Sequence, residues 1–443
     1  MTLETTSVGS TGLAKDEYPS LTHANYALGL LFVTYLLSFM DRQVLTLLVG
    51  PIREQFGLSD FQFSLLQGAA FAVTYTIAGI PLGRLADRYS RRWIIAGSIF
   101  SWSVMTCACG WAKSYSQLFL ARMGVGIGEA GLSPAAYSII TDSYRPDHMG
   151  YALSFYKMGV TVGGGLALVL GGMIYDFYLA QPSIEWPLIG ELKPWQATLI
   201  TAGLPGFVLC ILMGTIQEPS RKGVAISKTS ATDAQKSFPF MTVIRFLWQR
   251  KRLYGVLFLG SSFLSIANYG SAAWYPEMLA RNYGLSKSET GSAFGMIYLI
   301  AGTIGVMAGP FLASRLQRAG YADANVRTVL IASIVSILPA TLAPLMGSAE
   351  STLLVLWPTV FISMTYLGIM AVSFQLITPN EMRGQTTAIY IFVTNIMGMA
   401  VGTSVLAGFT DFLFQDDLAL PYSIAAVNAV FYPLAAALFW YCL

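Results

Sequence analysis

The chain alternates long apolar runs with short polar stretches, and a single polar stretch near its middle is much longer than the others. About 20 consecutive apolar residues in a helix cross a bilayer, so each long run predicts a membrane-spanning helix. The runs and their breakers predict twelve such helices, near residues 25–48, 61–84, 92–111, 115–141, 150–175, 195–216, 253–276, 289–316, 326–346, 352–377, 385–409 and 420–442. The pattern is that of an all-α membrane protein.

The long polar stretch divides the predicted helices into two sets of six. We expect a disordered tail over residues 1–24, an N-terminal six-helix bundle over 25–216, a linker over 217–252 and a C-terminal six-helix bundle over 253–443. The first 24 residues are polar and lack the short apolar core of a signal peptide. The architecture is therefore six plus six helices about a soluble linker.

Composition excludes an ordinary soluble fold. Hydrophobic residues make up 55% of the chain and charged residues 11%, and the mean hydropathy is +0.58. The four cysteines lie in apolar stretches without the spacing of a metal site or a disulfide framework; they are Cys107, Cys109, Cys210 and Cys442. We expect no metal and no cofactor.

The distribution of lysine and arginine predicts the orientation. Loops on the side of the N-terminus carry eighteen of these residues, whereas the opposite side carries five: Arg53, Lys113, Lys193, Arg281 and Lys287. Because positive loops stay in the cytoplasm, both termini and the linker are predicted to be cytoplasmic. We expect a multi-pass protein of a plasma membrane or inner membrane.

One motif recurs between the halves. After the second predicted span the chain reads Gly79-Ile-Pro-Leu-Gly83-Arg-Leu-Ala-Asp-Arg, and after the eighth it reads Gly305-Val-Met-Ala-Gly309-Pro-Phe-Leu-Ala-Ser-Arg. Two glycines four residues apart leave a bare strip on a helix, which allows a neighbouring helix to approach closely. The recurrence indicates a weak internal duplication, as is common in transporters.

The first copy of the motif ends in charges that predict a conformational latch. Asp87 lies among Arg88, Arg91 and Arg92 at the predicted cytoplasmic mouth, where charge-assisted hydrogen bonds can break and reform. The latch should bond across the cytoplasmic face when the path opens outward, and it should be broken when the path opens inward. Alternatively, the arginines only fix the topology.

These residues resemble a known family. The run from Gly79 to Arg92 resembles the signature loop of the major facilitator superfamily. More narrowly, Met40-Asp41-Arg42 and the glycine-rich run from Leu120 to Ala130 are similar to the Spinster lysolipid and sphingolipid transporters, as is the stretch from Ser154 to Gly165. The resemblance implies proton-linked transport of lysophospholipids or of amphiphiles similar to sphingosine-1-phosphate.

Four charges fall inside predicted spans. A charge at the bilayer centre costs about 2.5–3.5 kcal/mol or more, so it needs a partner or a function. The first span carries Asp41 and Arg42, and the fourth carries Arg122 and Glu129 on one helix face. If the two spans meet at a cavity, as the resemblance implies, Asp41 and Glu129 carry the proton while both arginines compete for the carboxylates and an anionic substrate head. Alternatively, the four charges form a permanent structural quartet.

The predicted substrate site combines these charges with neutral residues of the second half. It includes Arg42, Arg122 and Glu129 together with Asn268, Tyr269, Trp274, Tyr298, Tyr366, Gln375, Tyr390 and Asn395. A cavity charged on one side and aromatic on the other suits an amphiphile, although aromatic residues in membrane proteins are also common as packing groups or interfacial anchors. Lys157, about two turns from the cytoplasmic end of the fifth span, can snorkel to the interface.

Other function classes find little support. The sequence contains no GxxxxGK[ST] for ATP binding and no HExxH or GxSxG for hydrolysis, so we expect no enzyme. A gradient-independent scramblase or channel and a drug or organic-anion carrier of the same superfamily are the alternatives to a lysolipid carrier. The expected partners are the amphiphile, protons and membrane lipids, without nucleic acid, and the expected state is a monomer.

Overall fold

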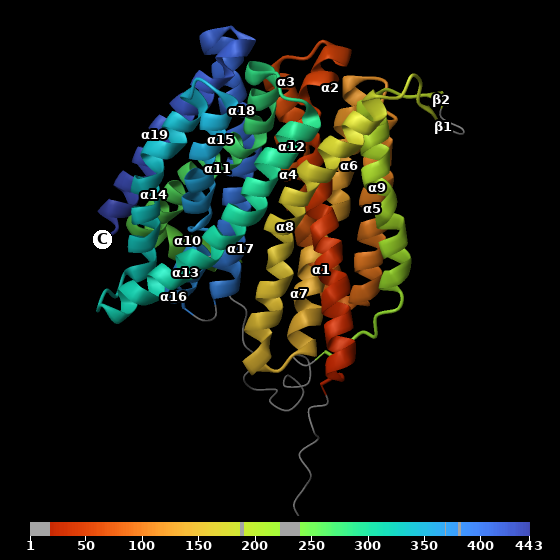
Figure 1. The fold of residues 1–443 in the computed structure, drawn as a ribbon. Helices are drawn as coiled ribbons and strands as arrows, with labels where there is room; N and C mark the ends of the chain where they lie inside the picture. The colour runs from red at the N-terminus through yellow and green to blue at the C-terminus, as the bar shows by residue number, and fades with distance from the viewer. Residues whose placement is uncertain (1–17, 187–189, 222–239, 368, 380–381) are drawn as a thin grey trace, which may run out of the picture.

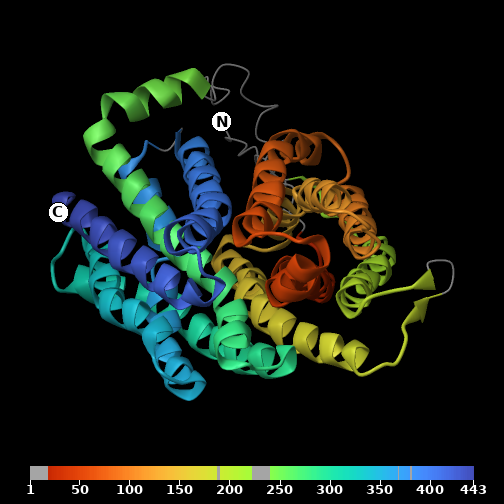
Figure 2. The same ribbon diagram turned by 90° about the horizontal axis from the view of Figure 1, so that it is seen from above.

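The structure, a computed structural model, describes residues 18–186, 190–221, 240–367, 369–379 and 382–443. Nearly all of these residues are helical, and the helices form two bundles that lie side by side in both views (Figure 1, Figure 2). The N-terminal half contains the helices from α1 to α9, and the C-terminal half those from α11 to α19. The predicted fold class is confirmed.

Besides a 3-10 helix at Leu45–Leu47 and a π-helical segment at Leu65–Ala69, the described part of the N-terminal half has nine α-helices and one short hairpin. They are α1 (Leu21–Val44), α2 (Val49–Phe56), α3 (Asp60–Ser64), α4 (Ala70–Arg88), α5 (Arg91–Gly110), α6 (Tyr115–Glu129), α7 (Leu132–Ser143), α8 (Pro146–Leu179), β1 (Glu185–Trp186), β2 (Gly190–Glu191) and α9 (Pro194–Met213). We name the end of the molecule that carries the β1–β2 hairpin the hairpin face, and the end where α1 begins the N-terminal face (Figure 1).

The C-terminal half is preceded by α10 (Phe240–Gln249), at the end of the predicted linker. It comprises α11 (Lys251–Tyr283), α12 (Lys287–Ile297), α13 (Thr303–Arg318), α14 (Ala324–Leu342), α15 (Ala349–Met364), α16 (Ile369–Ile377), α17 (Arg383–Asn395), α18 (Thr403–Gly408) and α19 (Leu420–Tyr441). Linker residues 222–239 and tail residues 1–17 lie outside the described residues. The helix α1 begins at Leu21 rather than at residue 25, because Ser20 caps it by accepting a hydrogen bond from the amide of His23.

Eleven helical segments in the described part of the chain are long and apolar enough to cross a membrane. The predicted fourth span, residues 115–141, is instead divided between α6 and α7, which are separated by a turn at residues 130–131. At this turn the backbone of Gly131 lies against Ser98 of α5, where an added Cβ would overlap the serine hydroxyl. The predicted fourth span is therefore a helix that is broken at this turn.

Glycines bring the two halves into close contact. Gly165 and Gly172 of α8 lie against the α12 backbone and its continuation, and Gly291 and Gly295 of α12 lie against α8 in return. An added Cβ at each of these four positions would overlap a backbone atom of the opposing helix. These glycines of α8 and α12 therefore allow the two halves to pack closely at their boundary.

Short π-helical segments line the same boundary. The segment Leu65–Ala69 precedes α4, Tyr298–Gly302 joins α12 to α13, and Ile396–Gly402 joins α17 to α18. The first and third of these meet, with Gly68 against the carbonyl of Met399, and the second packs against α8. Segments of this kind are often found at functional sites.

The two copies of the glycine motif pack differently. In α13, Gly305 and Gly309 lie directly against the carbonyls of Phe361 in α15 and of Thr365 just after it. In α4, an added Cβ at Gly79 would meet no atom within 4 Å, and one at Gly83 would only touch Pro134 at 3.9 Å. The bare strip predicted from the first copy is thus not used for close packing in this conformation, whereas the second copy uses it.

This difference predicts opposite effects of alanine. Gly309→Ala should destabilise the protein by about 1–3 kcal/mol, because the methyl group would force α13 away from α15. Gly79→Ala should be neutral or stabilising by up to about 1 kcal/mol, since alanine is the better helix former and the site is open. Thermal unfolding of both variants in detergent tests the pair, and equal losses of stability would contradict this packing.

Candidate functional site

The first and fourth predicted spans meet at an ion pair inside the N-terminal half. Arg42 of α1 donates to Glu129 of α6, with its Nε and Nη2 atoms 2.7 and 2.6 Å from Oε2. The glutamate side chain is fully buried and that of Arg42 is 12% exposed. The structure thus brings together two of the four predicted charges, Arg42 and Glu129, in a place that water barely reaches.

Asp41 and Arg122 lie beside this pair, and neither forms an ion pair with a described residue. The carboxylate of Asp41 accepts one hydrogen bond, at 3.1 Å from Thr106 of α5, and no Lys or Arg nitrogen in the described residues lies within 4.0 Å of it. Arg122 donates to the backbone carbonyl of Asp41 at 3.4 Å. Its Nε and the Oε1 of Glu129 are buried without a hydrogen-bond partner. The quartet is assembled but only half paired.

Aromatic rings surround the guanidinium of Arg42. Its central carbon lies 4.7 Å from the ring centre of Phe39, 4.6 Å from that of Phe71 and 4.8 Å from that of Tyr75. The electron-rich faces of these rings attract a cation, and this attraction offsets part of the cost of dehydrating the guanidinium. The rings therefore hold Arg42 at the cluster and narrow the directions from which an anion can reach it.

Two hydroxyl groups complete the cluster, and the sequence analysis missed both. Ser38 of α1 donates to Glu129 Oε2 at 2.6 Å, and Thr106 donates to Asp41. Serine and threonine in apolar helices commonly bond the carbonyl one turn earlier in the same helix, so their sequence pattern carries little information about partners. The position of Ser38, one turn before Arg42 on the same helix face, is the only available signal.

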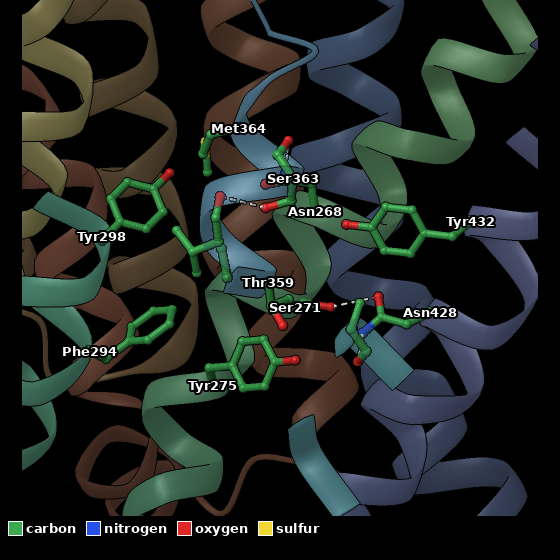
Figure 3. Close-up of a pocket in the computed structure, with 13 residues that line it drawn as sticks. Asn268, Ser271, Tyr275, Phe294, Tyr298, Thr359, Ser363, Met364, Asn428 and Tyr432 are labelled. Atoms are coloured by element: carbon green, nitrogen blue, oxygen red, sulfur yellow. Dashed lines mark hydrogen bonds between the residues drawn. The ribbon is translucent and has the colours of Figure 1, made fainter. Parts of the chain in front are cut away.

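In the second half, Tyr269 lies near this cluster. It is half-buried on α11 and lies close enough to Arg42 for the two side chains to interact electrostatically. Asn268 and Tyr298 instead line a small cavity inside the C-terminal half, where the Asn268 amide donates to the carbonyl of Ser363 at 3.1 Å (Figure 3). The cavity volume is about 20 Å³, which is room for one water molecule, and the buried hydroxyl of Tyr275 beside it lacks a partner.

The other predicted residues of the second half are dispersed. Trp274 is fully buried and donates to the carbonyl of Thr403 at 3.1 Å. Tyr366 and Tyr390 are buried within the C-terminal half, Asn395 is half-buried at the end of α17, and Gln375 is exposed. The structure therefore does not gather these five side chains around the charges in this conformation.

At the N-terminal face, Asp87 and Arg88 are exposed and make no ion pair in the described part of the chain. The backbone of this loop is held by Arg221, which donates to the carbonyls of Ala86, Asp87 and Tyr89. These contacts stay within the N-terminal half and the start of the linker. The charges of the predicted latch thus form no bond to the C-terminal half among these residues.

Arg91 anchors the chain that leaves the N-terminal half. Its side chain is fully buried, pairs with Asp142 at the end of α7 and with Glu218 at 3.0 Å, and also donates to the carbonyl of Pro219. Arg92 donates to the carbonyl of Ile216 at 3.1 Å. The two arginines therefore connect α5, α7 and the segment after α9, which is more than a topological signal.

The buried anchor predicts a dependence of stability on pH. Burial alone would raise the pKa of Glu218, but hydrogen bonds from Ser90 and from the backbone and side chain of Arg91 outweigh it and hold the pKa below its ordinary value. A carboxyl group with a lowered pKa stabilises the fold above its unfolded pKa, and this stabilisation is lost as the pH falls through the folded value. Acidification should therefore lower the melting temperature more in the wild type than in Glu218→Gln.

An exposed ion pair provides the control. Hydrogen bonding to Arg327 lowers the pKa of Asp323 at the surface, where such pairs contribute little to stability. Asp323→Asn should therefore leave the acid sensitivity of the melting temperature nearly unchanged. If Glu218→Gln behaved in the same way, Glu218 would not anchor this segment.

A second cluster of charges closes the hairpin face. The buried carboxylate of Asp60 lies between Arg53 of its own half, at 2.9 Å, and Arg281 of the other half, whose two Nη atoms each lie 2.9 Å from one carboxylate oxygen. Glu277 pairs with Arg281 and Lys287 and accepts a hydrogen bond from the amide of Gly50. The sequence analysis counted these basic residues only as topology signals, because loop charges of both signs are ordinary at helix ends and the pair of Asp60 and Arg281 joins residues that are remote in sequence.

The described bonds between the halves gather toward this face. Besides the pair of Asp60 and Arg281, they include Asp417 with Arg53, Asp411 with the amide of Phe61, and Asp176 with the amide of Ser288. Ser64 and Ser404 bond at 3.0 Å, and Thr161 and Thr303 bond at 2.9 Å further from the hairpin face. Hydrogen bonds and ion pairs thus join the two halves at the hairpin face. At the N-terminal face, Asp87 and Arg88 form no ion pair with the described residues of the C-terminal half.

Comparison with known proteins agrees with this arrangement. A sequence model described as Major Facilitator Superfamily matches residues 31–403. An MFS-type efflux pump of Mycolicibacterium smegmatis is 27% identical over 431 residues, which cover 93% of this chain and 92% of the pump. Protein spinster homolog 1 of Bos taurus is 25% identical over 422 residues, covering 91% of this chain and 76% of that protein.

A solved structure resembles the whole chain. A bacterial homologue of the human lysosomal transporter Spinster, in an inward-facing and unoccupied conformation, superimposes with a TM-score of 0.77 at 26% identity, covering 95% of this chain and 97% of that one. A D-xylose-proton symporter shares the fold with a TM-score of 0.69 at 15% identity, covering 94% of this chain and 97% of the symporter.

Proposed function

We propose that this chain, a member of the Major Facilitator Superfamily with Spinster-like relatives, couples protons to the transport of lysophospholipids or of amphiphiles similar to sphingosine-1-phosphate. Its family makes it an integral membrane secondary transporter and not an enzyme. Transport proceeds by alternating access between the two halves. The N-terminal face is the cytoplasmic side, so the present conformation is inward-facing.

The observation that carries the proposal is the half-paired charge cluster. A static quartet would gain most from two complete ion pairs, because a buried charge without a partner is costly. Here Arg42 and Glu129 are paired while the carboxyl group of Asp41 meets only a hydroxyl. A carboxyl group that contacts a hydroxyl group and no cation can gain or lose a proton without breaking an ion pair, which supports a role for Asp41 in taking up protons.

The cluster links substrate to proton through competition for Arg42. An anionic headgroup that draws Arg42 toward itself leaves Glu129 buried without its cation, so Glu129 then takes up a proton. When the headgroup leaves, Arg42 returns to Glu129 and the proton is released. The hydroxyl groups of Ser38 and Thr106 hold the two carboxyl groups in place through the exchange.

A carrier of drugs or organic anions is the second candidate, since the efflux pump of M. smegmatis covers 93% of this chain. The charge cluster would serve that substrate class equally well. The lysolipid proposal relies further on the aromatic wall of Phe39, Phe71 and Tyr75 around Arg42, because an amphiphile needs an apolar surface beside its charged head.

Transport in proteoliposomes tests the proposal. A fluorescent lysophospholipid should move faster under an imposed pH gradient than without one, and unlabelled lysophospholipid should compete with it better than single-chain drugs do. An equal transport rate with and without the pH gradient would indicate a facilitator or scramblase. Stronger competition by the drugs would favour the second candidate.

A further inference from the structure

Lys157 of α8 lies one helical turn beyond Thr161, whose bond to Thr303 joins the two halves. The stripe of α8 that faces the C-terminal half contains Thr161, Gly165 and Gly172, each of which packs against α12, α13 or the π-helical segment between them. Lys157 continues this stripe one turn toward the N-terminal face. It is exposed, although the rest of the stripe is covered.

Lys157 has no carboxylate partner in the described part of the chain, where every salt bridge involves other residues. It lies on the same helix face as Gly164, seven residues later, and Gly164 packs near Tyr298 of the other half and Gln43 of α1. Because Gln43 follows Arg42, Lys157 is about 10 Å nearer the N-terminal face than the level of the charge cluster. Its ammonium group is thus an unpaired cation beside the path between the halves.

The wall opposite Lys157 presents Met307 and Phe311, and the guanidinium of Arg315 lies 4.6 Å from the centre of the Phe311 ring. Thr161 and Thr303 bond to each other, and α8 and α13 run in opposite directions, so Met307 is at the level of Lys157, one turn beyond that bond. Met307 is 68% exposed and Phe311, a further turn along, is 59% exposed. A cation on one wall therefore faces a thioether and an aromatic ring on the other.

We propose that Lys157 is a second binding group for the anionic head of the substrate, which it holds between the charge cluster and the N-terminal face while the chain of the amphiphile lies along Met307 and Phe311. This inference rests on the proposed function and narrows the substrate class to amphiphiles with net negative charge. Arg42 can bind the phosphate of any lysophospholipid, whereas Lys157 favours a head whose phosphate is not neutralised by its own ammonium group.

Binding to purified protein in neutral-detergent micelles tests this inference. The probes are lysophosphatidylglycerol, which is anionic, and lysophosphatidylcholine, which is zwitterionic. Wild type should bind the anionic probe more tightly, and Lys157→Gln should weaken its binding about tenfold while it changes binding of the zwitterionic probe less than twofold. Lys157→Arg should retain the preference, as should Lys113→Gln at the opposite face.

Three results would overturn the inference. One is an unchanged preference in Lys157→Gln while both probes still bind, which would leave the lysolipid proposal intact. Another is equally strong displacement of the anionic probe by two-chain phosphatidylglycerol, which would make Lys157 a contact for bilayer lipid. The last is a wild type that binds neither lysolipid, and this result would overturn the proposed function as well.

Discussion

Glu129→Gln should reduce transport driven by a pH gradient at least tenfold while the protein remains folded. The amide removes both the proton-binding group and the negative charge that holds Arg42 at 2.6 Å. Arg42 then stays available to the substrate head in every step, so binding is no longer exchanged for a proton. Binding of an anionic substrate should therefore persist or tighten even though coupled transport is lost. Asp41→Asn should also reduce coupled transport.

Uptake into proteoliposomes with and without a pH gradient, together with binding in detergent, separates these effects. Glu350→Gln, which neutralises an exposed acid at the start of α15, is the matched control and should transport like the wild type. Full gradient-driven transport by both Asp41→Asn and Glu129→Gln would assign the cluster a structural role instead.

Asp60→Asn should open the hairpin face. The buried carboxylate of Asp60 holds Arg53 and Arg281 at once, and removing one partner of a buried pair typically costs about 3–5 kcal/mol. Much of this cost destabilises only the conformation with a closed hairpin face, because Arg281 becomes hydrated again when the halves separate there. The balance between inward-facing and outward-facing states should therefore shift toward the latter by about a hundredfold or more.

A cross-link across the closed face measures this balance. The hydroxyl oxygens of Ser64 and Ser404 are 3.0 Å apart, so cysteines at both positions should form a disulfide while the face is closed. The yield should fall sharply when Asp60→Asn is added and remain high with Glu54→Gln, an exposed acid on the same face. An equal yield in both backgrounds would mean that Asp60 does not hold the halves together.

The spans could be predicted because hydropathy acts on every residue of a helix that crosses lipid. Their interruptions are harder to predict. The turn between α6 and α7 lies four residues before Pro134, which has no amide to bond the carbonyl of Ala130. Yet Pro81 and Pro205 lie inside continuous helices. The glycine motif shows the same limit. Its spacing indicates a bare strip, but only tertiary packing determines that Gly309 uses this strip and Gly79 leaves it open.

The charged residues of the site could be identified from the sequence, because any charge within an apolar run is conspicuous. Their pairing could not. Seven residues separate Arg122 from Glu129 on one face of α6, yet Glu129 bonds Arg42 of another helix. The ion pair at the hairpin face could not be predicted for a related reason. Asp60 and Arg281 each lie at the end of a helix, where a charge is ordinary, and only the fold brings them together.

The π-helical segments at the boundary bear on how the length of these helices can change during evolution. A π turn encloses one residue more than an α turn, since its hydrogen bonds reach back five residues instead of four. Deleting one residue within Ile396–Gly402 would let the segment relax to an α-helix and keep the flanking faces in register. The same deletion in the middle of α8 would rotate every following residue by about 100°, and the glycines that meet α12 would no longer face it. Single-residue insertions and deletions in related sequences should therefore concentrate at the π segments.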